Sequence, residues 1–128
     1  IVRLVGSEMC IRDSIIIVVM LETPKAINNV EEIASVPGID VLLVGTNDLC
    51  MEMGIPGEFN HNDVKEAYKK VIQACNNNNI LPGMGGVYDE TLMHEYIDLG
   101  MKFILSGSDL SFLVKGAEDR LNNLKNKG

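Results

Sequence analysis

The sequence predicts an α/β domain built on a parallel sheet. Apolar segments recur along the chain, and a segment with helical spacing follows each of them; they lie at residues 15–21, 41–44, 80–84 and 103–105. The first two do not alternate polar with apolar side chains, which is typical of strands buried on both faces. Repeated β-then-α units place their strands parallel and join them by right-handed crossovers.

Local signals mark the first and last helices. Thr23 can cap the first helix, and Pro24 is favoured at its first position. Residues 36–38, Val-Pro-Gly, close it. The last helix is expected to follow Asp109 and to run into a polar tail.

The middle of the chain carries three further helix signals. A short helix is expected at residues 49–53, and a longer one has apolar residues at helical spacing over 64–75. The asparagines at 76–79 are expected to end the longer helix. Asp89 is expected to cap the next helix and Gly100 to terminate it.

Two architectures accommodate four such units: a small open α/β sheet, or half of an eightfold β/α barrel. In either case, a ligand site is expected beyond the carboxyl ends of the strands. Polar or glycine residues follow every predicted strand at this point, namely Glu22, residues 47–48, 85–86 and 107–109. Composition and periodicity do not choose between the two architectures.

Composition narrows the class of protein. The 128 residues suffice for one domain, and 46% hydrophobic with 23% charged residues is a globular balance. A net charge of −7, 5% aromatic residues and no Trp argue against a nucleic-acid partner. Three cysteines without CxxC spacing fit a reducing cytoplasm. The longest apolar run, residues 15–21, is far too short to span a bilayer, so we expect a soluble cytoplasmic protein without membrane partners.

The first fourteen residues look foreign. Residues 8–14, Glu-Met-Cys-Ile-Arg-Asp-Ser, can be back-translated to a string containing AGATGTGTATAAGAGACAG. This string resembles the transposon end that is ligated to DNA fragments in sequencing libraries. We therefore expect residues 1–14 to be a non-native artefact and native sequence to begin near Ile15.

Two acidic residues are candidates for metal ligands. Glu22 directly follows the first predicted strand, and Asp48 comes just after the second. If these strands are neighbours about 4.8 Å apart, both carboxylates reach one point above the sheet. Two carboxylates with open positions suit a hard divalent cation such as Mg²⁺ or Mn²⁺. A structural alternative remains open, in which Glu22 belongs to a helix N-terminus and Asp48 caps the next helix.

Six short motifs, in order, resemble the HpcH/HpaI aldolase family, the class II, metal-dependent pyruvate aldolases. The resemblance covers residues 15–115, and its motifs are Leu-Glu-Thr-Pro at 21–24, Val-Pro-Gly-Ile-Asp at 36–40, Val-Gly-Thr-Asn-Asp-Leu at 44–49, Gly-Ile-Pro-Gly at 54–57, Gly-Met-Gly-Gly-Val at 83–87 and Ser-Gly-Ser-Asp-Leu at 106–110. It implies that residues 15–128 are the C-terminal half, strands 5–8, of a (β/α)8 TIM barrel.

The resemblance also implies site residues and an activity. The metal ligands fall on Glu22 and Asp48, for Mg²⁺ or Mn²⁺ with Co²⁺ as a further choice. Backbone N–H groups of Asn47 and Asp48 hold the substrate carboxylate. The reaction implied is cleavage of a 4-hydroxy-2-oxo acid to pyruvate, or a similar 2-oxo acid, plus an aldehyde. The family's catalytic His and its Arg lie on earlier strands, so no catalytic residue is assigned here. Met20 stands where many members have Gln. Assembly as a homo-oligomer, often a hexamer, is also implied.

Two other functions fit parts of the same sequence. A citrate lyase or malyl-CoA lyase-like enzyme shares the carboxylate pair, but a CoA substrate calls for a basic groove and the chain is acidic. A phosphate-binding barrel would use the glycine-rich turns at residues 85–86 and 107–108.

The remaining reactive residue types are expected to have structural roles. His61 lies before a helix, His94 lies within one, and Cys50 is expected in the core.

Overall fold

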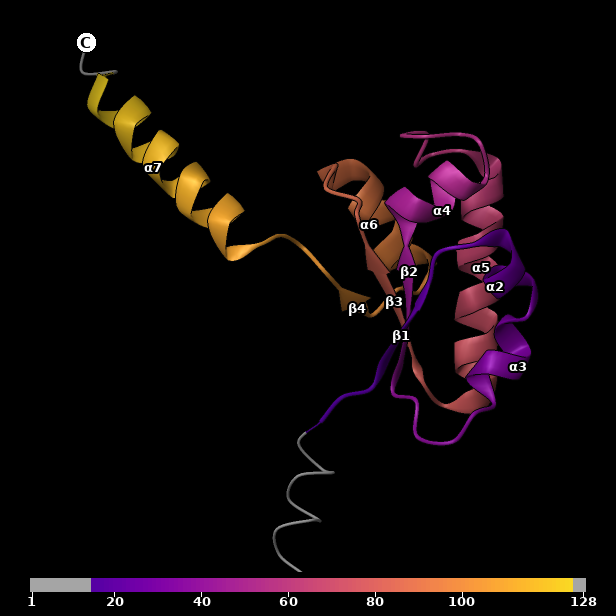
Figure 1. Cartoon of the computed structure of the whole chain (residues 1–128). Helices are drawn as coiled ribbons and strands as arrows, with labels where there is room; N and C mark the ends of the chain where they lie inside the picture. Colours follow the sequence, from indigo (N-terminus) through magenta and orange to yellow (C-terminus); the bar gives the residue numbers. More distant parts are fainter. Residues whose placement is uncertain (1–14, 126–128) are drawn as a thin grey trace, which may run out of the picture.

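Four parallel strands form one sheet in a computed structural model that describes residues 15–125 (Figure 1). The strands lie side by side in the order in which they occur along the chain, as β1 (Val18–Leu21), β2 (Val41–Gly45), β3 (Leu81–Gly85) and β4 (Phe103–Ile104). Each neighbouring pair is parallel. The predicted α/β class with a parallel sheet is therefore confirmed.

Helices make every connection between these strands. They are α2 (Pro24–Asn28) and α3 (Val30–Ala34) between β1 and β2, α4 (Thr46–Glu52) and α5 (Asn62–Asn78) between β2 and β3, α6 (Glu90–Leu99) before β4, and α7 (Asp109–Lys125) after it. Figure 1 shows α2, α3 and α5 together on one side of the sheet, whereas α7 extends away from it. No residue of α7 is buried.

The predicted caps are present. The Thr23 hydroxyl accepts a hydrogen bond from the Ala26 N–H at 3.1 Å, and Pro24 occupies the first turn of α2. Asp89 caps α6 by accepting from the Leu92 N–H at 2.9 Å, and Gly100 ends that helix with φ +126°. A left-handed φ costs glycine little, which is why this residue can stop the helix.

Element boundaries differ from the prediction at two places between β1 and α3. The strand predicted at 15–21 begins only at Val18, because Val18 pairs with Val41, the first residue of β2, and residues 15–17 run past the end of that neighbour. The single helix predicted after Pro24 is two short helices. Asn29, with φ −101° and ψ 14°, stands between them and departs from helical geometry.

In the β2–β3 connection, one helix boundary differs from the prediction and another agrees with it. The short helix predicted at 49–53 begins earlier, at Thr46, directly after β2. The asparagine run ends α5 as predicted, since the helix stops at Asn78 and its C-cap is Asn79. Asn79 then adopts φ +56°, a left-handed conformation that asparagine tolerates better than most residues.

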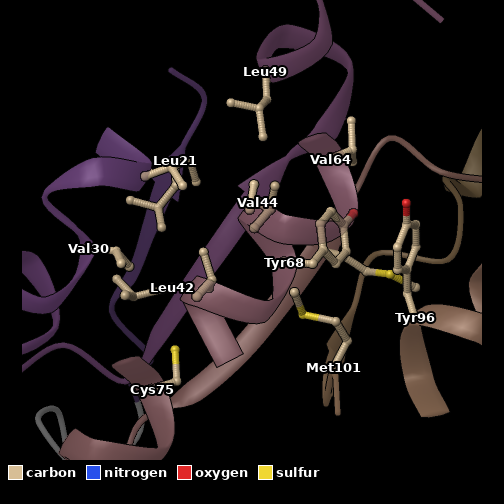
Figure 2. Packing of buried hydrophobic residues seen from close by; sticks show 14 of the residues in the cluster. Leu21, Val30, Leu42, Val44, Leu49, Val64, Tyr68, Cys75, Tyr96 and Met101 are labelled. Carbon is tan, nitrogen blue, oxygen red and sulfur yellow. The ribbon is translucent and has the colours of Figure 1, made fainter. Parts of the chain in front are cut away.

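The hydrophobic core lies between the sheet and its helices. Leu21, Leu42, Val44 and Met84 face this side of the sheet and are at most 1% exposed. Figure 2 shows how residues from the strands pack against α5 and α6; those from the two helices are Val64, Tyr68, Cys75 and Tyr96. Burial of these side chains is the main stabilising contribution of the fold.

The opposite face of the sheet leaves apolar side chains in solvent. Met20 is 51% exposed, Leu81 45% and Leu105 43%. They alternate along the chain with core-facing residues such as Leu21 and Ile104, as expected for a strand period of two. An apolar sheet face of this kind is normally covered by other protein.

Within residues 15–125, no helix combines the length and apolar character needed to cross a membrane.

We expect the isolated 128-residue chain to self-associate, because apolar side chains and the outer edges of β1 and β4 remain available for pairing. Size-exclusion chromatography with light scattering should give a mass above the 14.0 kDa of one chain. Replacing Met20 and Leu81 by Lys should reduce association. Replacing Val36, which is also exposed but lies in the turn before β2, should not. A folded monomer of the parent chain would contradict the expectation.

Candidate functional site

The strand register brings the ends of β1, β2 and β3 to one level. Leu21 pairs with Val44 and Gly45 pairs with Gly85, so Glu22 emerges beside Gly45 at the carboxyl edge of the sheet. Asp48 follows three residues later in the first turn of α4. The two predicted metal ligands therefore come from adjacent strand ends at the same edge of the sheet.

Gly45 makes room for the Glu22 side chain. A Cβ atom placed on Gly45 would lie 2.7 Å from Glu22 Cγ and 2.9 Å from its Oε1. The carboxylate thus lies against the end of β2 in space that any other residue would occupy. Glu22 is partly buried, whereas Asp48 is exposed.

As to the structural alternative, Asp48 is not the cap of α4, whereas Glu22 directly precedes the N-cap of α2 without capping it. Thr23, not Glu22, caps α2. The N-cap of α4 is Gly45, no side chain caps that helix, and Asp48 lies inside its first turn. Both carboxylates are thus free of a helix-capping hydrogen bond.

A small cavity of about 120 Å³ opens at this edge of the sheet. Apolar side chains form part of its wall and the start of α4 forms another part; the lining residues are Met20, Leu43, Gly45, Thr46, Asn47, Asp48, Gly85, Gly86 and Leu105. The first N–H groups of a helix have no acceptor within the helix. The N–H groups of Asn47 and Asp48 belong to this set, and they stand at the end of the helix that favours an anion.

Gly86 brings the end of β3 close to α4. It has φ +85°, and a Cβ atom there would lie 3.2 Å from the Asn47 nitrogen and 3.5 Å from Asn47 Cβ. A larger residue would be strained by its backbone conformation and would crowd the Asn47 N–H. Glycine at this position therefore keeps that N–H group uncovered.

Thr46, which the sequence analysis did not single out, is the buried polar group of the site. Its hydroxyl donates to the Gly85 carbonyl at 2.8 Å and lies 2.6 Å from the Tyr68 hydroxyl. Because Thr46 has one hydroxyl hydrogen and gives it to Gly85, Tyr68 is the donor in the second hydrogen bond. Burial raises the pKa of Tyr68 to about 12, although the hydrogen bond with Thr46 opposes part of that rise.

Tyr68 is in turn held by α6. Its ring stacks on that of Tyr96 (Figure 2). The ring centroids are 4.1 Å apart and the planes differ by 22°. The Tyr96 hydroxyl donates to the Phe59 carbonyl in the loop before α5. Burial raises the pKa of Tyr96 as well, so both rings remain neutral hydrogen-bond donors at physiological pH.

The other reactive residues have structural roles or lie apart, as expected. His61 caps α5 by accepting a hydrogen bond from the Asp63 N–H at 3.2 Å. His94 is exposed on α6. Cys50 is fully buried, and burial together with the charge of Glu58 raises its pKa, so it is a poor nucleophile.

Among residues 15–125, no three or more His, Cys, Asp or Glu side chains are grouped as metal ligands. The candidate centre therefore rests on two oxygen ligands, Glu22 and Asp48. Two carboxylates fit a hard cation that completes its coordination with water or substrate oxygens. They would not suit a closed structural zinc site, which takes four protein ligands.

Fold and site together define an α/β protein whose polar residues gather at the carboxyl edge of a parallel sheet. Among such proteins, the chain belongs to the HpcH/HpaI aldolase/citrate lyase family, whose sequence profile matches residues 4–116. The match begins inside the segment that we expect to be foreign. Residues 1–14 lie outside the described residues, and their foreign origin stays a prediction.

Individual relatives agree with this membership. A 4-hydroxy-4-methyl-2-oxoglutarate aldolase of Chaetomium globosum is 37% identical over 114 residues, which are 88% of this chain and 42% of the relative. A 4-hydroxy-2-oxo-heptane-1,7-dioate aldolase of Klebsiella pneumoniae is 33% identical over 106 residues, covering 83% of this chain and 40% of the relative. The chain thus spans less than half the length of these relatives.

A solved structure extends the similarity to the fold. The HpcH/HpaI aldolase from Desulfitobacterium hafniense superposes with a TM-score of 0.75 at 26% identity. The superposition covers 91% of this chain and 45% of that protein. Nearly all of this chain therefore matches under half of a larger family structure.

The two buried cysteines should resist thiol reagents in the folded chain. Cys50 and Cys75 have no exposed surface, and burial raises the pKa of Cys75 from 9.0 to about 11. As pH rises, the Cys75 thiol ionises in the unfolded chain before it ionises in the folded chain. The free energy of unfolding is therefore unaffected by this thiol below about pH 9 and falls between about pH 9 and 11.

Ellman's reagent tests this expectation in a Cys10→Ser background. At pH 8 the folded chain should react far more slowly than the same chain in denaturant, and the difference should narrow toward pH 11. Equal rates at pH 8 would show that the thiols are accessible and that the packing around them is wrong.

Proposed function

We propose that this chain is the carboxyl-terminal half of a (β/α)8 barrel and that the complete protein, called the parent protein below, is a metal-dependent aldolase. The observation that carries the proposal is the convergence of Glu22 and the start of α4 at one sheet edge in a chain of this family. The exposed apolar face of the sheet supports the half-barrel, since four more strands would cover it. The length comparison with the relatives agrees.

Glu22 and Asp48 would hold the cation, with Mg²⁺ or Mn²⁺ favoured by their oxygen ligands and Co²⁺ also compatible. A bound divalent cation supplies Lewis acidity, which stabilises negative charge on substrate oxygen as the carbon–carbon bond breaks. The N–H groups of Asn47 and Asp48 would bind the substrate carboxylate and so orient it toward the two acidic side chains. The residues of this chain thereby bind and position the substrate.

The substrate class follows from the relatives. Two of them carry the names of aldolases acting on 4-hydroxy-2-oxo acids, so we propose a 2-oxo acid such as pyruvate and an aldehyde as products. None of the four strands carries a lysine, which leaves them without a Schiff-base residue. The base that moves the proton would come from the other half of the barrel, so the 128-residue chain alone should show no turnover. We also propose that the parent protein is a homo-oligomer and is located in the cytoplasm.

A phosphate-binding barrel remains the second candidate because of a larger cavity beside β4. It measures about 540 Å³ and is lined by Tyr88, Ser106, Gly107, Ser108, Ser111, Phe112 and Lys115. Lys115 is the single cation in this lining, and it pairs with Asp119. Ser111 already donates to the Ser108 carbonyl. These partners leave few hydrogen-bond donors free for a phosphate group.

A CoA-ester lyase is disfavoured because its substrate calls for a basic groove and the chain has a net charge of −7.

A thermal melt of the parent protein separates these candidates. Ligands that bind only the folded state raise its melting temperature. Mn²⁺, and more strongly Mn²⁺ with oxalate as a mimic of the 2-oxo acid, should stabilise an aldolase. Stabilisation by phosphate alone would favour the phosphate-binding barrel instead.

Removing either carboxylate should abolish metal binding. Glu22→Gln and Asp48→Asn each delete one of two anionic ligands, and we expect the parent protein to lose Mn²⁺ affinity by about two orders of magnitude or more and its aldolase rate with it. Paramagnetic resonance of free Mn²⁺ measures the affinity. The control is Glu31→Gln on α3, where glutamine still provides an acceptor for the Asn77 amide. Unchanged affinity in either ligand variant would refute the assignment.

Gly45→Ala should weaken metal binding without unfolding the protein. The new Cβ would lie 2.7 Å from Glu22 Cγ, closer than two nonbonded carbon atoms approach, and would drive that side chain from the end of β2. Because φ is −80° at this residue, the backbone itself accommodates alanine. We expect Mn²⁺ affinity to fall about tenfold or more, with a small change in melting temperature.

The matched control for this variant is Gly116→Ala in α7, where no atom lies within 4 Å of the new Cβ. It should leave Mn²⁺ affinity unchanged. If Gly45→Ala binds Mn²⁺ like the unaltered protein, Glu22 does not act from the position described.

A further inference from the structure

We propose that the buried hydroxyl of Thr46 is a positioning group that holds the first turn of α4, and with it Asp48, in place at the sheet edge where Glu22 emerges. This inference rests on the proposed function, since it concerns the same candidate metal ligands. Thr46 touches neither carboxylate in the contacts described, so its effect would be exerted through the backbone of α4.

The Thr46 hydroxyl ties two neighbouring strand ends together. Thr46 directly follows β2, and its hydroxyl donates across to the carbonyl of Gly85, the last residue of β3, at 2.8 Å. Thr46 has no exposed surface, and within residues 15–125 it is the one buried polar or charged residue apart from the buried tyrosines and cysteines. A hydrogen bond shielded from water in this way resists exchange with solvent.

Tyr68 fixes the orientation of that hydroxyl. Its own hydroxyl donates to Thr46 at 2.6 Å, which leaves the Thr46 hydrogen directed at Gly85. Tyr68 is fully buried on α5 and is itself held by stacking on Tyr96. A chain of contacts therefore runs from the body of the helical layer to the start of α4.

The first turn of α4 has few other restraints. The helix has seven residues, a length at which an isolated helix is unstable in water. Its N-cap is Gly45, and no side chain caps it. Leu49 and Cys50 anchor the far side of the helix in the core. The Thr46 hydroxyl is thus the polar attachment nearest to Asp48.

Threonine and valine have nearly the same shape, which allows a clean test. Thr46→Val removes the hydroxyl and leaves the Gly85 carbonyl and the Tyr68 hydroxyl buried without this partner. Thr46→Ser restores the hydroxyl and removes a methyl group. Tyr68→Phe keeps the Thr46–Gly85 hydrogen bond but frees the orientation of the Thr46 hydroxyl. Thr91→Val, at an exposed position on α6, is the matched control.

Amide hydrogen exchange, read by mass spectrometry on the 128-residue chain, reports order in α4 without any metal. We expect amides at residues 49–52 to exchange about tenfold or more faster in Thr46→Val, with α5 unchanged. Thr46→Ser should stay within about threefold of the unaltered chain, and Tyr68→Phe should fall between the two. Unchanged exchange in Thr46→Val, or equally fast exchange in Thr46→Ser, would overturn the proposal.

Mn²⁺ affinity of the parent protein gives the second readout. Thr46→Val should bind Mn²⁺ about tenfold more weakly, and Thr46→Ser should recover most of the affinity. Absence of Mn²⁺ binding by the unaltered parent protein would refute the proposed function while hydrogen exchange still decides the role of Thr46. If Thr46→Val does not fold, Tyr68→Phe and Thr46→Ser decide it: an effect in Tyr68→Phe with none in Thr46→Ser supports the proposal, and any other pattern refutes it.

Discussion

The parallel pairing of β2 with both β1 and β3 determines how the helices and the candidate site are arranged around the sheet. β2 is almost completely buried, and its register with both neighbours brings Glu22, Gly45 and Gly85 to one level. Parallel neighbours require crossover connections, which is why helices separate every pair of strands. The same geometry sends all the carboxyl ends to one edge, so residues that follow different strands become neighbours there.

Close approach of backbone segments gives this edge its chemistry. Glycine at position 45 admits the Glu22 side chain, and glycine at position 86 lets the end of β3 approach Asn47. Thr46 then joins the two strand ends through its hydroxyl. The two glycines and the buried Thr46–Gly85 hydrogen bond together keep the start of α4 beside the Glu22 carboxylate.

The two faces of the sheet have different surroundings. Leu42 and Val44 meet the helices, whereas Met20 and Leu81 remain in solvent on the opposite face. The two aldolase relatives and the solved aldolase are each more than twice as long as the region that matches this chain, which agrees with the proposed barrel. In that barrel, the remaining strands would cover this exposed face.

Local sequence patterns were enough to predict the α/β class, the order of the elements, the caps at Thr23 and Asp89 and the two acidic residues at strand ends. Each of these depends on periodicity or on a residue and its immediate neighbours. Tertiary structure decided where β1 begins, since pairing requires a partner strand and β2 starts at Val41. It also decided the early start of α4 and the contacts of Thr46 with Gly85 and Tyr68. These contacts join residues 22 and 39 positions apart, and no local pattern specifies which distant hydroxyl or carbonyl a buried threonine will meet.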